Sequence, residues 1–244
     1  NDGYELFDNN RSIRAKQLIE PLEKISYDDL KRIKFDRQMP ERIVYPYGYR
    51  ADSLFLIDQT ILPDSLQMLM KALKNWDRRA NPESKGAAIY MLAYQIVPQV
   101  MRTRNGAPLN TSEAIEVYRR MHAYLITHFG KTDITLGDLQ KLVRGDEEWP
   151  QGGLPDVLAA VSTTPYKEGK RKMSSGDAYI ALVRFPGNGK LPKIETVNTF
   201  GASSNPGDAH FADQRQMYQS QTLKSMSLDK NEILNKAERI YSPR

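Results

Sequence analysis

Residues 177–200 read DAYIALVRFPGNGKLPKIETVNTF and mark the change from helical to strand patterning. In the segment 177–185, Tyr179 and every second residue after it alternate with the set that begins at Ile180, which is the period of a strand. Both sets are largely apolar, so the pattern predicts a strand that is buried on both faces. The Gly-rich turn predicts an antiparallel partner over 193–200. Because two strands alone cannot bury both faces, other structure must cover them.

The chain before this point is patterned as helices. Apolar residues recur at helical spacing, and most segments open with a residue that caps helices well. The expected helices cover residues 10–22, 26–36, 64–76, 84–97, 110–130 and 135–145, with two later ones at 211–225 and 229–239. The expected caps are Asn10, Ser26 with Asp29, Asp64, Ser84, Asn110 with Glu113, and Gly130 at a C-terminal end.

These patterns predict an α+β fold that is mainly helical. We expect a helical domain over residues 1–175, followed by a short antiparallel strand pair and closing helices over 176–244. The helices should pack through the apolar residues on their inner faces. These are Leu66, Leu69, Leu73, Trp76, Ile89 and Leu92.

Composition narrows the class of protein. The 244 residues are 40% hydrophobic and 27% charged, as in an ordinary folded domain. The sequence has no cysteine, which excludes disulfides and thiolate chemistry. It also has no apolar run of membrane-spanning length and no secretory signal in NDGYELFDNN, so we expect no membrane partner.

Positive charge is concentrated near the C-terminus. Residues 167–244 hold 13 Lys and Arg against 8 Asp and Glu, which accounts for the whole net charge of +5. The densest part is KEGKRKM at 167–173. A solvated loop and a phosphate-binding patch both fit this run. We favour the loop and expect no nucleic-acid partner, because no nucleic-acid motif accompanies the charge.

The block GDAYIALVRF…TFGASSNPGDAHFADQ resembles the C-terminal end of the penicillin acylase family of N-terminal-nucleophile amidohydrolases. Three earlier blocks agree in order, at NNRSIRAKQLIEPL, at LKNWDRRANPESKGAA and at LGDLQKLVRGDEEWPQGGLPDVL. The matches near the C-terminus are Gly201, Ser203, Asn205, Pro206, Gly207, His210, Asp213 and Gln214, with departures at Ala202, Ala209 and Phe211.

The resemblance implies hydrolysis of an acyl amide by the hydroxyl of an N-terminal Ser, with its α-amine as base. Asn1 has neither a hydroxyl nor a thiol, so we expect the nucleophile and the oxyanion hole upstream of this chain. The chain then corresponds to the C-terminal part of a β-subunit and would be inactive alone. Its strand pair would extend the αββα core of the full enzyme.

The resemblance also implies partners and surroundings. The partners would be the remainder of the acylase and an N-acylated small molecule, such as a penicillin, an N-acyl-homoserine lactone or a lipopeptide. The family implies a periplasmic or secreted location. We expect no cofactor and no metal site in this chain, although calcium is possible in the full enzyme; the spacing of Asp2 and Glu5 does not fit a calcium site.

Arg11 is the one candidate catalytic residue, in a supporting role. By resemblance it matches an arginine near the oxyanion Asn, where it would hold polar groups; Arg14 competes for that alignment. His210 could be a base or a ligand, but we favour a buried structural histidine. His122 and His128 lie six residues apart in one predicted helix, and therefore on different faces.

Two further interpretations stay open. Tyr45, Tyr47 and Tyr49 could line a pocket, although a packed loop fits them better. As a different class of protein, a non-catalytic helical interaction module or a basic nucleic-acid-binding domain would also fit the composition. The acyl-chain and leaving-group specificity cannot be inferred from these residues.

Overall fold

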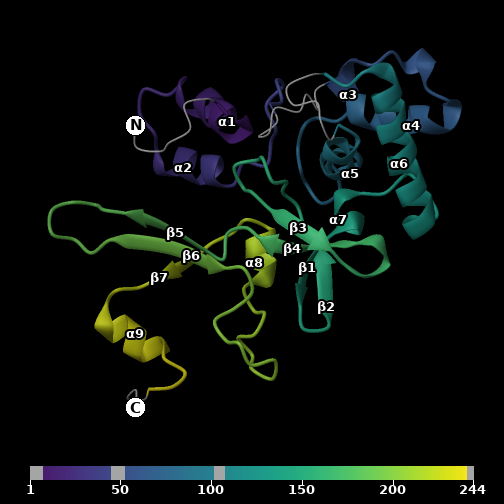
Figure 1. Ribbon diagram of the computed structural model, residues 1–244. Coiled ribbons are helices and arrows are strands. Elements are labelled where there is room, and N and C mark those ends of the chain that lie inside the picture. Colours follow the sequence, from purple (N-terminus) through teal and green to yellow (C-terminus); the bar gives the residue numbers. More distant parts are fainter. Residues whose placement is uncertain (1–7, 45–52, 102–107, 241–244) are drawn as a thin grey trace. The chain divides into compact units, whose positions relative to one another are not determined.

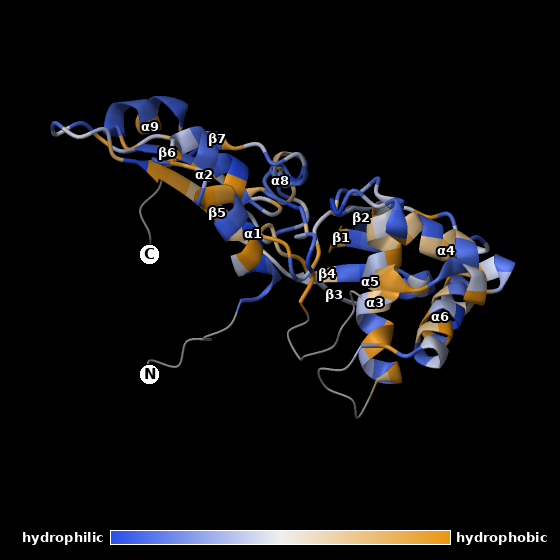
Figure 2. Ribbon diagram, turned by 90° about the horizontal axis from the view of Figure 1, so that it is seen from above, coloured by the Kyte–Doolittle hydropathy of each residue, from blue (hydrophilic) through white to orange (hydrophobic). Residues whose placement is uncertain are grey.

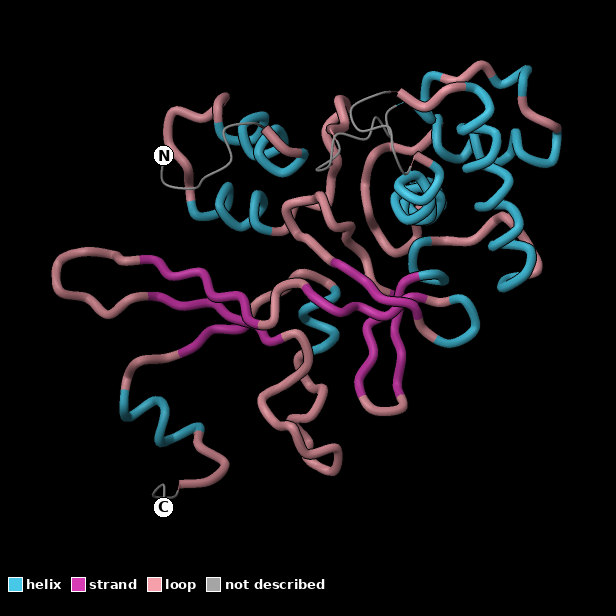
Figure 3. Tube along the Cα trace, viewed as in Figure 1, coloured by secondary structure: helices cyan, strands magenta, loops and turns pink. Residues whose placement is uncertain are grey.

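The computed structural model describes residues 8–44, 53–101 and 108–240. The chain divides into two compact units, Asn1–Gly176 and Asp177–Arg244 (Figure 1). Helices and two small, mostly antiparallel sheets make up the described residues, so the predicted α+β class is confirmed (Figure 3). Within these ranges, no helix combines the length and apolar character that a membrane span requires.

Helices dominate the first unit (Figure 1). In chain order they are α1 (Asn10–Ile19), α2 (Tyr27–Lys34), α3 (Ser53–Leu56), the 3₁₀ turn η1 (Gln59–Ile61), α4 (Asp64–Lys74), α5 (Lys85–Val100), α6 (Thr111–Phe129) and α7 (Leu136–Leu139).

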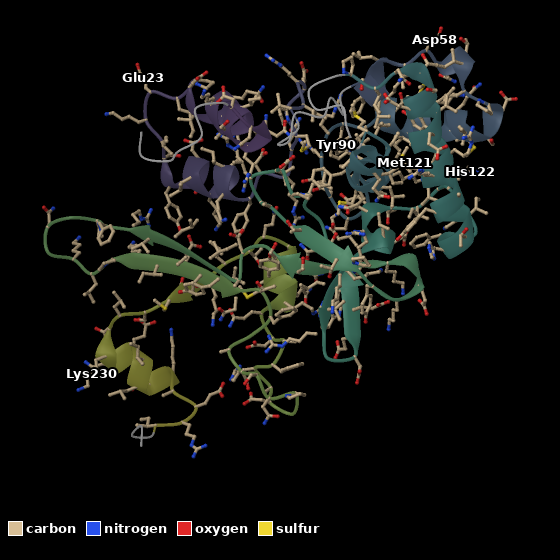
Figure 4. The ribbon with its side chains drawn as sticks, viewed as in Figure 1. Glu23, Asp58, Tyr90, Met121, His122 and Lys230 are labelled. Atoms are coloured by element: carbon tan, nitrogen blue, oxygen red, sulfur yellow. The ribbon has the colours of Figure 1, made fainter. Side chains whose placement is uncertain are left out.

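The main core lies where α4, α5 and α6 pack on one another. All six residues predicted for this core are buried, so that prediction is confirmed. Tyr90 of α5 and Met121 of α6 are fully buried in it (Figure 4). The hydroxyl of the buried Tyr118 donates a hydrogen bond of 3.0 Å to the carbonyl oxygen of Leu54, which joins α6 to α3 and satisfies the only polar atom of that side chain.

A glycine sets the distance between the start of α5 and the chain that follows α4. A Cβ at Gly86 would lie 2.3 Å from the Cβ of Trp76 and 2.4 Å from its Cγ. The indole cannot move away freely, because its Nε1 donates a 2.7 Å hydrogen bond to the carbonyl oxygen of Arg79. Gly86 is therefore required by packing rather than by backbone conformation.

We predict that Gly86→Ala destabilises the chain by about 1–3 kcal/mol through overpacking, although alanine is the better helix former. The free energy of unfolding, measured by chemical denaturation, tests this. Gly207→Ala is a matched control, because its Cβ would lie 3.7 Å from the nearest atom. A Gly86→Ala chain as stable as the wild type would show that the tryptophan is not held in place.

The predicted caps are correct at three helices and wrong at two. Ser26 with Asp29 and Asn110 with Glu113 form capping boxes, Ser84 caps α5, and Gly130 ends α6 in the left-handed region with a φ of 68°. At α1 the cap is Asn9 rather than Asn10, because Asn10 is already helical and its side chain points into buried contacts. At α4 the cap position is Pro63, which offers no side-chain hydrogen bond, and Asp64 is the first helical residue.

The predicted helix over 135–145 is wrong beyond Leu139, where the chain turns into strand β1 (Gln140–Arg144). The sheet that follows was not predicted, and its strands run in the order β2-β1-β4-β3. Its other members are β2 (Glu147–Pro150), β3 (Ser162–Pro165) and β4 (Arg171–Ser175). Strands β1 and β4 are parallel and the other pairs are antiparallel. Gly145 has a φ of 59°, which allows the tight turn from β1 to β2.

The basic run 167–173 is only partly a loop. Lys167–Gly169 form a 3₁₀ turn, η2, and the residues from Arg171 onward belong to β4. The side chain of Arg171 is 8% exposed, so this part of the run is not a solvated segment. The prediction of a loop is therefore wrong for its second half, because pairing with β1 and β3 recruits it into the sheet.

The second unit contains the strand pair that the sequence predicts. Strands β5 (Tyr179–Arg184) and β6 (Lys193–Asn198) are antiparallel, and a third strand, β7 (Lys224–Met226), pairs with β6. Two short helices, α8 (Arg215–Gln219) and α9 (Lys230–Lys236), complete the described part. The predicted helix over 211–225 is thus wrong outside α8.

Strand β5 is apolar along most of its length (Figure 2), but it is buried on one face only. Ile180 and Leu182 are 4% and 7% exposed, whereas Tyr179 and Val183 are 51% and 41% exposed. The prediction of burial on both faces is therefore wrong. The face of β5 that carries Tyr179 and Val183 is apolar and exposed, and such a surface can contact other structure.

Candidate functional site

The first polar cluster lies at the start of α1, around the 1% exposed side chain of Asn10. Its amide nitrogen donates to the carbonyl oxygen of Val44 and, at 3.1 Å, to Oδ2 of Asp156. Its amide oxygen accepts a hydrogen bond of 2.6 Å from the backbone N–H of Val44. One side chain therefore ties three distant segments of the first unit together.

Asp156 is a buried carboxylate. It is 8% exposed, and burial raises its pKa above the ordinary value, while the Asn10 amide and the charge of Arg11 act in the opposite direction. Arg11 is thus the cation whose charge lowers the pKa of Asp156. Its own side chain is exposed, and it makes no hydrogen bond with the described residues.

Arg14, the other arginine on this helix, has a structural role. Its Nε and Nη2 donate to the two carboxylate oxygens of Asp36 at 3.1 and 2.8 Å, and the pair is mostly buried. Asp36 also accepts a 3.0 Å hydrogen bond from the backbone N–H of Gln38. Arg14 is committed to this bidentate contact, so Arg11 is the arginine of α1 that is available to a further group.

The second cluster lies in the second unit, around His210. Its Nδ1 is 2.8 Å from Oδ2 of Asp213 and its Nε2 is 3.1 Å from Oε2 of Glu238. These two carboxylates raise the pKa of His210 to about 9. The side chain is 42% exposed, so the prediction of a buried structural histidine is wrong. His210 is instead a surface cation that joins the turn to the segment after α9.

The turn that carries His210 depends on backbone contacts. A Cβ at Gly201 would lie 2.0 Å from the carbonyl oxygen of His210, so only glycine fits there. Gln214 is 3% exposed, and its Oε1 accepts a 2.9 Å hydrogen bond from the backbone N–H of Asn198 at the end of β6. The sequence interpretation did not identify this role, although Gln214 is among the residues that carry the family resemblance.

The remaining candidates do not form a site. His122 and His128 both lie on α6, and the ring of His128 is 4.5 Å from that of Tyr124. Across residues 8–44, 53–101 and 108–240, no group of three or more potential metal ligands is close enough to hold an ion. Five earlier candidates lie outside the described residues: Asp2, Glu5, Tyr45, Tyr47 and Tyr49.

The model of the penicillin amidase family matches residues 2–235 of this chain. This family is a class of acyl-amide hydrolases. That match covers nearly the whole chain. The chain therefore belongs to the penicillin amidase family, which confirms the resemblance found in the four sequence blocks.

Relatives that match this chain include proteins named acyl-homoserine lactone acylase PvdQ. The protein from Pseudomonas syringae pv. syringae (strain B728a) is 26% identical over 242 residues, which is 89% of this chain and 30% of the relative. The one from Pseudomonas fluorescens (strain Pf0-1) is 28% identical over 199 residues, covering 68% of this chain and 25% of the relative. The chain thus spans between 25% and 30% of the length of these proteins.

The His210 cluster predicts a pH dependence of stability. Its folded pKa of about 9 lies above the ordinary 6.5, so the stabilisation is fully present below pH 6.5 and is lost as the pH rises through about 9. His210→Gln should remove this part of the fall in melting temperature over that interval. Glu238→Gln, which removes one of the two carboxylates, should remove it in part. If the melting temperature falls equally with pH in the wild type and in His210→Gln, the raised pKa assigned to His210 is contradicted.

Proposed function

We propose that this chain is the C-terminal part of the β-subunit of an amidohydrolase that cleaves an acyl amide. The observation that carries the proposal is the family match over residues 2–235, together with relatives three to four times longer than the matched part. The nucleophile, an N-terminal Ser, would be supplied by a segment outside this chain. The 244 residues alone would then be inactive.

The substrate that fits best is an N-acyl-homoserine lactone, because the matching relatives carry that substrate class in their names. A penicillin-like or lipopeptide amide is the alternative within the same chemistry. The Ser hydroxyl would attack the amide carbonyl with the α-amine as base, an oxyanion hole would stabilise the intermediate, and water would release the acid. This chemistry needs no cofactor, and calcium in the assembled enzyme would be structural.

Arg11 would act on this chemistry as a positioning residue. It is exposed on the first turn of α1, and the buried Asn10 beneath it holds that turn to Val44 and Asp156. A guanidinium fixed at its base can hold polar groups of a neighbouring segment through several hydrogen bonds. Under this proposal that segment carries the oxyanion Asn.

The remainder of the acylase is the partner that the second unit would contact. Strand β5 lies at an edge of its three-stranded sheet and pairs with β6 alone among the described strands. Its outward Tyr179 and Val183 are 51% and 41% exposed, and Phe185 just beyond it is 77% exposed. The unpaired backbone groups of an edge strand favour the addition of further strands, and the exposed apolar face of β5 would pack against the added structure. By its family, the assembled enzyme would work in the periplasm or outside the cell.

The family match favours this proposal over a non-catalytic helical module or a nucleic-acid-binding domain. The direct experiment is to express the whole gene that encodes these residues and to measure acid release from N-acyl-homoserine lactones of several chain lengths. Penicillins and lipopeptide amides serve as the alternative substrates. Sequencing the new N-terminus of the mature protein identifies the nucleophile. A mature, folded enzyme that is inactive on every N-acyl substrate would contradict the proposal.

Arg11→Ala in the full enzyme should lower kcat/KM by about tenfold or more, since charge-assisted hydrogen bonds of this kind contribute roughly 1.5–3 kcal/mol. Arg11→Lys should restore part of the loss. Lys16→Ala, on the same helix and with an exposed ion pair to Asp8, is the matched control. An unchanged kcat/KM together with an unchanged pH profile would remove Arg11 from the site.

Mixing this chain with the separately produced remainder of the enzyme should raise its melting temperature in a concentration-dependent way, by mass action. Tyr179→Ser with Val183→Ser should weaken the effect, because both replace exposed apolar surface of β5. Lys230→Ser on α9 is an exposed control. If the chain stays monomeric and its melting temperature does not change when the remainder is added, the exposed face and edge of β5 are not an interface.

A further inference from the structure

Four lysines lie on or next to strands β1 and β4 of the β2-β1-β4-β3 sheet in the first unit, and Figure 1 shows the strands of this sheet. We call this group the lysine face, and it consists of Lys141, Lys167, Lys170 and Lys172. Lys141 of β1 and Lys172 of β4 are direct partners in the parallel register. Side chains in paired positions project to the same side of a sheet, so these two ammonium groups share one face.

The carboxylates near the lysine face neutralise only part of it. Glu148 of β2 lies 2.6 Å from Nζ of Lys170 and 3.9 Å from Nζ of Lys167. Glu168 lies 3.1 Å from the same Lys170. Four lysines against two carboxylates leave an excess of two positive charges. Within the described part of the chain, Lys141 and Lys172 have no carboxylate at ion-pair distance.

The pairing of Lys141 with Lys172 places two positive charges next to each other, which costs free energy of folding. Like charges on directly paired positions of neighbouring strands destabilise a sheet. Burial lowers the pKa of Lys141, and the nearby charge of Lys170 lowers it further, against the opposing effects of Glu148 and of Asp138. Asp138 acts on Lys141 only through its field, because the two side chains form no ion pair; its Oδ2 accepts hydrogen bonds from the backbone N–H and hydroxyl of Thr135.

The lysine face is also held in place. The Tyr124 hydroxyl donates a 2.6 Å hydrogen bond to the carbonyl oxygen of Gly169, in the turn between β3 and β4. A Cβ at Gly169 would lie 2.2 Å from Cγ of His128, so the turn packs directly on α6. The Tyr166 ring then lies 5.4 Å from Nζ of Lys167 and 5.9 Å from Nζ of Lys172, which orients both cations through the ring face.

A further buried cation lies in this sheet, on the face opposite to Lys172, because successive residues of a strand point to opposite faces. Arg171, between Lys170 and Lys172, is 8% exposed. Its Nε donates to the hydroxyl of Thr163 at 2.9 Å and its Nη2 to the Thr163 carbonyl oxygen at 3.0 Å. These partners are neutral, so its charge is not cancelled by them.

We propose that the lysine face binds a phosphate-type anion carrying two or more negative charges, held between Lys141 and Lys172. Two ammonium groups on paired strand positions, without a carboxylate at ion-pair distance among the described residues, match such an anion in charge, and lysine binds phosphate as a compact point charge. The anion would also relieve the repulsion across β1 and β4. This site is independent of the amide chemistry proposed above, and the basic run 167–173 supplies three of its four lysines.

The test uses the full-length gene product that contains this chain, at low ionic strength. Pyrophosphate is titrated by calorimetry, and vesicles of equimolar phosphatidic acid, whose headgroup is a phosphomonoester, and phosphatidylcholine are compared with vesicles of phosphatidylcholine alone. The test variant is Lys141→Gln with Lys172→Gln. The charge-matched control is Lys74→Gln with Lys85→Gln, which changes two exposed lysines on or next to helices of the bundle.

The test variant should bind pyrophosphate at least about tenfold more weakly than wild type and control, as expected for the loss of charge-assisted contacts. Its melting temperature without ligand should not fall, because a like-charge pair is removed. Binding of both pyrophosphate and the anionic vesicles identifies a lipid headgroup as an accessible source, whereas pyrophosphate alone identifies a soluble phosphate. Absence of pyrophosphate binding, or equal weakening in test and control variants, would overturn the proposal.

Discussion

The buried side-chain amide of Asn10 is the contact on which the first polar cluster depends. It is 1% exposed, and it links α1 to the backbone at Val44 and to the carboxylate of Asp156, 146 positions along the chain. A buried amide left without partners costs about 1–3 kcal/mol, and Asn10 is the buried residue of α1, so this amide and the Arg14–Asp36 pair attach the helix through polar contacts. The backbone of Arg11, the next residue, is held by the same contact, while its side chain is exposed.

The other end of this contact is fixed by the segment after β2. The side chain of Gln140 donates to the carbonyl oxygens of Gln151 and Gly153 at 3.0 and 2.9 Å, and Gly153, with a φ of 99°, donates its N–H to the carbonyl oxygen of Ala80 at 2.7 Å. These bonds attach the Gly-Gly turn to the helical core immediately before Asp156. These contacts connect the helical core, the four-stranded sheet and α1 within the first unit.

Sequence patterns predicted the features that depend on local order. The bundle core and strands β5 and β6 follow from apolar periodicity, and the caps at Ser26 and Asn110 follow from neighbours three residues away. The four-stranded sheet was missed because QKLVR at 140–144 fits helical spacing as well as a strand, and its partner β4 lies some 30 residues later with few apolar residues. The raised pKa of His210 depends on Asp213, three residues away, and also on Glu238, 28 residues away, and no local pattern indicates the second contact.

The central claim is that the Asn10–Asp156 contact holds α1, and Arg11 with it, in place. A double-mutant cycle of Asn10→Ala and Asp156→Ala, with the free energy of unfolding measured for each variant, tests it most directly. The account predicts that the two substitutions are not additive, with a coupling energy of about 0.5–3 kcal/mol, because each removes the partner of the other. Additive effects within about 0.3 kcal/mol would contradict it, since distant and independent sites behave in that way.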